Sequence, residues 1–206
     1  MTVTDIPALA WHDGIDINGA PYPTRNDALS VQGDSDNAYD LPSDLVDYAR
    51  AIHEAGHAVA ALIGGAHLHH AQIVKGPATT PEGGVTEICN PFVNGHAYAT
   101  FFAAGERAVD RWLREDGLWT PDRAVVNEVG AYSDRRSFLA LNPHVGFGDK
   151  QIDYTVVHDL ADNFLNQHWD AVTRVAHALN HHAHLTGDEI ARIAGLPNRP
   201  RPSCTA

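Results

Sequence analysis

Apolar residues recur every three or four positions from Leu45 to Leu62, the spacing of one face of an α-helix over about five turns. The stretch follows Pro42, and Ser43 belongs to the residue types favoured at a helix N-cap. Gly64 and Gly65 come next, and glycine commonly ends a helix. The pattern therefore predicts a helix over residues 43–63.

The rest of the chain has weaker patterns of the same kind. Residues 68–75 and 83–89 predict two short strands, joined by a turn rich in glycine and proline. Helical spacing returns over residues 96–115, 133–141, 149–168 and 169–184, and the last two ranges are compatible with one continuous helix. Residues 118–131 are mixed, residues 144–149 are expected to form a loop, and Thr186 to Glu189 match a capping box before a last short helix. The expected fold class is mainly α with a small β-hairpin.

The two ends of the chain differ from its middle. Residues 1–42 hold seven Asp, one Arg and no Glu or Lys, a net charge of −6, and they lack a helical period. We expect an acidic, irregular N-terminal arm there, a single domain over residues 43–195, and a flexible proline-rich tail over residues 196–206.

Composition narrows the function classes. The net charge is −12 and no basic stripe is present, which argues against binding to nucleic acid. No apolar run is long enough for a membrane span, and the first residues lack the features of a secretory signal. Two cysteines cannot build a disulfide scaffold, so we expect a reducing compartment, hence the cytoplasm.

The chemistry is concentrated in His53-Glu54-Ala55-Gly56-His57, inside the predicted helix. Histidines four residues apart share a helix face and can bind one zinc ion together. Glu54 lies one step further round the helix, where it can take a proton from a water on the metal. The small Ala55 and Gly56 are expected to leave the site open to substrate. This is the pattern of a zincin-like metallopeptidase.

The third metal ligand is not fixed by spacing. Ala60 and Ile63 stand where a metzincin has its Gly and third His, so that class is excluded. Glu106 and Asp110 on the next long helix, and Asp134, stay open as candidates, and a thermolysin-like arrangement would favour Glu106.

Several segments together resemble the peptidase domain of the FtsH-type, AAA-associated ATP-dependent zinc metalloproteases. They are AIHEAGHAVAALIGG, the strand pair HLHHAQIVKGPATTPEGGVTEI, the helix AAGERAVDRWL and the stretch Gly130-Ala131-Tyr132-Ser133-Asp134. The last is similar to the family's Gly-Ala-x-x-Asp. The resemblance covers residues 43–194 and implies that His53, His57 and Asp134 are the zinc ligands and that Glu54 is the catalytic base. It does not extend to an ATPase module or to the acidic arm.

The expected function is therefore a soluble zinc metalloendopeptidase that hydrolyses peptides or unfolded proteins without its own ATPase. The strand around Gly84, Val85 and Thr86 is expected to bind an extended substrate. Two alternatives stay open: a metal-stabilised interaction protein without proteolytic activity, and a peptidase module that docks on a separate ATPase or another partner. Homo-oligomerisation stays open as well.

Other potential ligands lie near the first predicted strand. His67, His69 and His70 stand at the junction of helix and strand, and a regular strand would place His69 and His70 on opposite faces. Cys89 is expected to be a small buried hydrophobic residue. Arg135 and Arg136 are expected either to hold the Asp134 carboxylate or a substrate carbonyl, or to be solvated.

Overall fold

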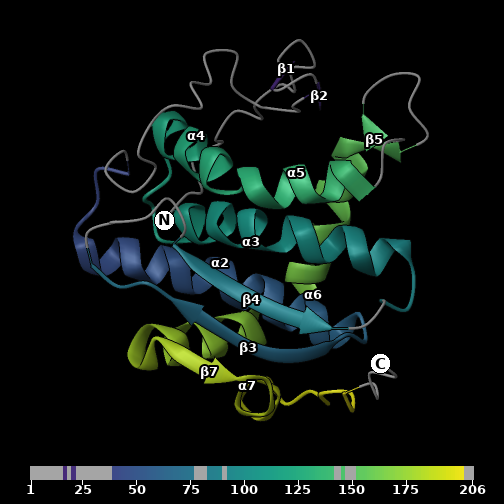
Figure 1. Cartoon of the computed structure of the whole chain (residues 1–206). Coiled ribbons are helices and arrows are strands. Elements are labelled where there is room, and N and C mark those ends of the chain that lie inside the picture. Colours follow the sequence, from purple (N-terminus) through teal and green to yellow (C-terminus); the bar gives the residue numbers. More distant parts are fainter. Residues whose placement is uncertain are drawn as a thin grey trace.

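The computed structural model describes residues 16–17, 20–21, 39–76, 83–89, 92–141, 145–146 and 152–201 (Figure 1). Its helices are α2 (Ser43–Ile63), α3 (Gly95–Glu115), α4 (Pro121–Gly130), α5 (Tyr132–Leu141), α6 (Tyr154–His182) and α7 (Gly187–Ala194). Its strands are β1 (Asp16–Ile17), β2 (Ala20–Pro21), β3 (His67–Ile73), β4 (Gly84–Cys89), β5 (Val145–Gly146), β6 (Ile152–Asp153) and β7 (His184–Thr186).

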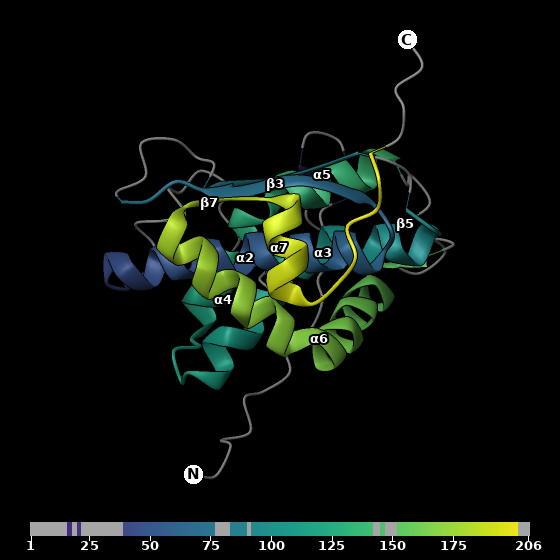
Figure 2. The same cartoon turned by 90° about the horizontal axis from the view of Figure 1, so that it is seen from below.

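Helix α2 is the centre of the hydrophobic core. It packs against α3, α6 and the sheet that contains β3, and its residues from Ala49 to Leu62 are buried with the exception of His53, which is half-buried. Figure 2 shows the sheet on one side of α2 and α6 on the opposite side. Because α2 is enclosed in this way, small residues dominate its sequence.

Gly56 allows α2 and α3 to approach closely. A methyl group built on Gly56 would lie 2.6 Å from the carbonyl oxygen of Ala104 on α3. Gly56 and the fully buried Ala55 therefore serve helix packing. The expectation that these two small residues keep the site open to substrate is wrong, because neither faces the pocket described below.

The principal sheet has three antiparallel strands in the order β4-β3-β7. Leu68, Ala71 and Ile73 of β3 turn inward to the core. A register shift between Leu68 and His70 leaves His69 as an extra residue on β3, a β-bulge. Among the described residues β4 pairs with β3 alone, so its other edge carries no strand.

Most predicted elements are confirmed. The helices over residues 43–63, 96–115 and 133–141 are present, and the capping box at Thr186 and Glu189 is formed. Residues 154–182 form one continuous helix, but Ile152 and Asp153, expected to be helical, belong to strand β6. The mainly α fold class is confirmed, with a third strand, β7, added to the predicted hairpin. Part of the expected loop at 144–149 is β5, and the rest of that loop lies outside the described residues.

Two local predictions are corrected. Pro42 rather than Ser43 is the N-cap of α2, with Ser43 as the first helical residue and no side-chain cap. Residues 121–130, expected to be mixed, form α4, because the Thr120 side chain accepts a hydrogen bond from the Arg123 N–H and Pro121 occupies a first-turn position.

Both ends of the domain extend by a few residues. Tyr39 is buried, and its carbonyl accepts a hydrogen bond from Arg123 Nε at 2.8 Å. Asn198 exchanges hydrogen bonds with the backbone of Leu68 on β3, at 3.0 Å and 2.9 Å. Most of the acidic arm, and residues 202–206 of the tail, lie outside the described residues. No helix in the described part of the chain has both the length and the apolar character to cross a membrane.

Candidate metal centre

His53 and His57 stand one turn apart on α2 and meet side by side. Their ring centroids are 4.7 Å apart, and their Nε2 atoms are 3.0 Å apart. His57 is buried, and its Nδ1 lies 2.6 Å from the carbonyl oxygen of Phe101 on α3. Because a carbonyl only accepts, Nδ1 must carry a hydrogen, which directs Nε2 of His57 toward His53.

Asp134, near the start of α5, completes a triangle with the two histidines. Its Oδ2 atom is 3.1 Å from His53 Nε2 and 3.2 Å from His57 Nε2. The three atoms thus lie at nearly equal distances from one another. Tetrahedral coordination with bonds of about 2.0–2.1 Å places neighbouring ligand atoms about 3.3 Å apart. The triangle is close to that size.

The donor set requires a positive charge among these atoms. If His57 is neutral, its only N–H is donated to Phe101, so Nε2 presents a lone pair to the lone pairs of Asp134. Two such acceptors at 3.2 Å repel each other unless a proton or a metal cation lies between them. Two imidazoles and a carboxylate fit zinc as ligands.

The pKa values of the metal-free site reflect the same demand for positive charge. Burial lowers the pKa of His57, but the charge and hydrogen bond of Asp134, with smaller contributions from Glu54 and Phe101, raise it overall to about 9. Burial raises the pKa of Asp134, and the neighbouring His57 and His53 outweigh this and hold it well below its ordinary value. In the absence of metal, the raised pKa of His57 therefore favours a proton within the triangle at neutral pH.

Gly105 on α3 makes room for the two imidazoles. A methyl group at this position would overlap Nε2 of His57 and lie 2.7 Å from Nε2 of His53. Gly105 was not predicted to belong to the site. The sequence does contain an indication of its role, because a glycine inside the helical segment AAGERAVDRWL is less favourable for the helix than alanine.

Glu54 lies beside the triangle but belongs to a different set of contacts. Its Oε2 accepts a hydrogen bond of 2.7 Å from the Thr86 hydroxyl on β4. A methyl group on Gly84 would lie 2.7 Å from Glu54 Oε1, so the backbone of β4 passes directly over the carboxylate. Burial raises the pKa of Glu54, partly offset by His53 and His57 and by the Thr86 bond.

The other two candidate ligands have different roles. Glu106 is buried and forms a double ion pair with the buried Arg135, one contact being 2.7 Å from Arg135 Nε to Glu106 Oε2. Asp110 accepts hydrogen bonds from Arg114 at 2.9 Å and from Trp119 at 3.0 Å. Neither belongs to the cluster of His53, His57 and Asp134.

Arg135 corrects the expectation for the residues after Asp134. It is only 1% exposed, and it holds Glu106 rather than the Asp134 carboxylate or solvent. The adjacent side chains of Asp134 and Arg135 thus point to different places: Asp134 to the two histidines, and Arg135 to Glu106 on α3. The Arg135–Glu106 pair joins α5 to α3 and fixes where Asp134 stands.

A pocket of about 360 Å³ opens at the triangle. Its lining includes the three candidate ligands and Glu54, and Gly84, Val85 and Thr86 of β4, the residues expected to bind substrate, form one wall. Phe102 and Asn127 contribute from α3 and α4. The structure also adds lining residues that the sequence analysis did not predict, Arg50 and Tyr39.

The comparisons with known proteins give no family for this chain. A scan against protein-family models and a search of curated proteins both find no match. The functional interpretation therefore depends on the geometry described above.

Proposed function

We propose that this protein is a zinc-dependent metallopeptidase in which His53, His57 and Asp134 hold the metal ion and Glu54 is the general base. One observation carries the proposal: three potential ligand atoms converge at 3.0–3.2 Å, and a separate carboxylate that is not part of the triangle lines the same pocket. The resemblance of residues 43–194 to FtsH-type peptidase domains agrees with this assignment of roles.

The metal would supply Lewis-acid chemistry at the triangle, polarising a carbonyl oxygen and lowering the pKa of water. Glu54 accepts the proton that water loses as it attacks the peptide carbonyl. The buried environment raises the pKa of Glu54, so the carboxylate holds this proton well and can donate it to the amine that leaves. The Thr86 hydroxyl orients the carboxylate throughout.

The open edge of β4 indicates which kind of substrate the site can bind. An extended peptide can add to an open sheet edge through backbone hydrogen bonds, and β4 runs past Glu54 at Gly84. Such binding needs a substrate whose own backbone is unpaired. We therefore propose peptides and unfolded protein segments as substrates, with Gly84, Val85 and Thr86 as the strand that binds them.

The position of Glu54 also favours peptidase activity over a purely structural metal site. A metal that only stabilises the fold needs no free carboxylate in its pocket, and burying Glu54 costs stability. An interaction protein without activity is therefore the weaker interpretation. A peptidase that docks on a separate ATPase remains compatible with the same site.

The test compares zinc content and hydrolysis of a fluorescently labelled unfolded protein for the wild type and Glu54→Gln. We expect one zinc ion at the triangle in both, and a rate about 10²–10⁴-fold lower in the variant. Glu115→Gln, a half-exposed glutamate at the end of α3, is the matched control and should keep the wild-type rate. Zinc binding without hydrolysis by the wild type would instead support the interaction protein.

A further inference from the structure

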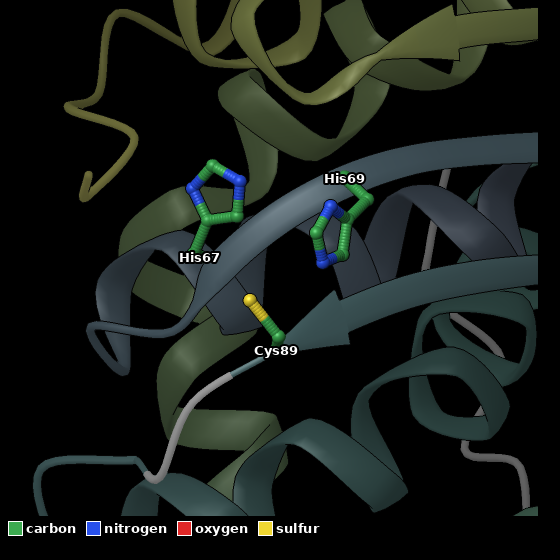
Figure 3. A group of neighbouring side chains, drawn as sticks. All are labelled: His67, His69 and Cys89. Carbon is green, nitrogen blue, oxygen red and sulfur yellow. The ribbon is translucent and has the colours of Figure 1, made fainter. Parts of the chain in front are cut away.

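A second group of potential ligands lies at the end of the sheet where β3 begins and β4 ends. Figure 3 shows His67 and His69 on β3 and Cys89 on β4, with the cysteine sulfur directed toward the two rings. One ligand atom from each residue lies within 4.8 Å of the other two. The rings of His67 and His69 meet edge to face at 4.8 Å. None of the three lines the pocket of the first site.

The pairing of β3 with β4 brings this group together. His67 pairs directly with Cys89 across the two antiparallel strands, which places their side chains on one face. His69 stands two residues after His67, and alternate residues of a strand share a face. His69 is also the extra residue of the bulge, which changes the phase of the strand after it. His69 therefore lies beside His67, and the change of phase turns His70 to the same face, where it contacts Glu87 at 3.4 Å.

This arrangement corrects two expectations. His69 and His70 do not alternate between opposite faces, because the bulge changes the phase of the strand between them. Cys89 is half-buried rather than buried, as had been expected for a small hydrophobic residue. A half-buried thiol beside two imidazoles has the donor chemistry of a metal site.

The hydrogen bond of His67 prepares it to bind a metal. Its Nδ1 lies at hydrogen-bond distance from the carbonyl oxygen of Arg199, so Nδ1 carries the hydrogen and Nε2 presents a lone pair. Metal-binding histidines usually donate their second ring nitrogen to a carbonyl or carboxylate in this way. The residues after α7 thus supply a supporting contact to the group.

We propose that His67, His69 and Cys89 form a second metal site that binds a zinc-type divalent ion, independent of the first site. Two imidazoles and a thiolate are a donor set for zinc and for transition ions of similar softness, and they leave a fourth position for water or another ligand. Tetrahedral ligand atoms lie about 3.3–3.6 Å apart, and the atoms of this group, all within 4.8 Å of one another, reach that spacing by side-chain rotation.

The site would fasten the edge strand of the sheet. A metal held by β3 and β4 cross-links the two strands at the end opposite Gly84, and His67 extends the link to Arg199. Binding to the folded state alone raises its stability. The strand that we propose to bind substrate would therefore be held in place by metal at one end and by its hydrogen bond to Glu54 near the other.

Cobalt(II) distinguishes the two sites, because only the second contains sulfur. We expect purified protein titrated with Co²⁺ to develop a near-ultraviolet thiolate-to-cobalt charge-transfer band, and to bind two Zn²⁺ ions with a rise in melting temperature. Cys89→Ser and His69→Ala should lose the band and one equivalent of zinc. His70→Ala and Cys204→Ser, which keep the three proposed ligands, should retain both.

Three results would overturn this second site: wild-type protein without the band, a band that survives in Cys89→Ser, or a band that disappears in Cys204→Ser. The cobalt band is independent of the peptidase proposal. If the first site is wrong and the second is right, the wild type binds a single ion and shows the band. If the reverse is true, it binds a single ion without the band.

Discussion

Gly105 lies directly beneath Nε2 of His57, on the face of α3 that packs against α2. Any side chain at this position would occupy the space of the imidazoles. The candidate metal centre therefore depends on a residue that offers no ligand atom.

Gly105→Ala should weaken zinc binding while the protein still folds. The added methyl group displaces His53 and His57 from the triangle, and disturbances around a metal site typically cost 10–100-fold in affinity, so we expect a loss of about that size. Overpacking should also cost about 1–3 kcal/mol of stability. Gly95→Ala, on the same helix with open space around it, is the control for both measurements. Equal zinc affinity in Gly105→Ala and the wild type would show that the metal lies elsewhere.

Replacement of Asp134 should affect zinc binding, whereas replacement of Glu106 should affect stability. Asp134→Ala removes a proposed ligand and should lower zinc affinity by orders of magnitude. Glu106→Ala leaves the buried Arg135 without its main partner, and breaking a buried pair typically costs about 3–5 kcal/mol. We therefore expect a strong fall in melting temperature for Glu106→Ala. Zinc titration and thermal unfolding of both variants measure the two effects, and zinc loss confined to Glu106→Ala would favour the thermolysin-like arrangement.

The sequence predicts those features of the fold and the site whose residues lie within one segment better than those set by contacts between segments. The helix around His53 and His57 was predicted because its spacing and end residues lie within one segment. The choice of Asp134 over Glu106 came from the resemblance, since spacing cannot say which face of α3 turns inward. The bulge at His69 could not be predicted, because a strand with one extra residue has nearly the same pattern of apolar and polar positions as a regular strand. The start of α4, by contrast, is visible in the sequence, because Thr120 and Pro121 are a local helix-start signal.

Zinc affinity should rise with pH between about pH 7 and 9. The pKa of His57 in the metal-free protein is raised to about 9, so below that pH zinc must displace a proton. One displaced proton corresponds to about a tenfold gain in affinity per pH unit, levelling off above pH 9. Competition titrations with a chelator of known pH dependence measure the slope. A flat profile would contradict a protonated His57 in the free site.

The stability of the metal-free protein should change in the opposite direction. The folded-state pKa of His57 lies above its ordinary value of 6.5, so protonation stabilises the fold. This contribution is fully present below pH 6.5 and is lost as the pH rises through about 9. We expect the melting temperature of metal-free wild type to fall over that window more than that of metal-free His57→Ala. Parallel curves for the two proteins would argue against the interaction of His57 with Asp134.

Glu54→Gln should lose activity without losing stability. Burial disfavours the charged carboxylate, so a neutral amide of the same shape removes that cost and can still accept the Thr86 hydrogen bond. The melting temperature of the metal-free variant at pH 7 should equal or exceed that of the wild type. Thr86→Val removes the donor and should lower stability by about 1 kcal/mol instead. A marked loss of stability in Glu54→Gln would assign Glu54 a structural role.

The last residues before α2 should prove to be part of the fold. Tyr39 is buried against the core and lines the pocket, and Arg123 donates hydrogen bonds to the carbonyls of Tyr39 and Asp40 at 2.8 Å and 2.9 Å. Removing a buried aromatic side chain typically costs about 3–5 kcal/mol. Two truncations isolate this contribution, one lacking residues 1–38 and one lacking residues 1–41. We expect the longer truncation to melt at a clearly lower temperature than the shorter one, and Tyr39→Ala in the full chain to reproduce most of the difference. Since Tyr39 also lines the pocket, Tyr39→Ala should alter the hydrolysis rate as well as the melting temperature. Equal melting temperatures for the two truncations would return the start of the domain to Pro42.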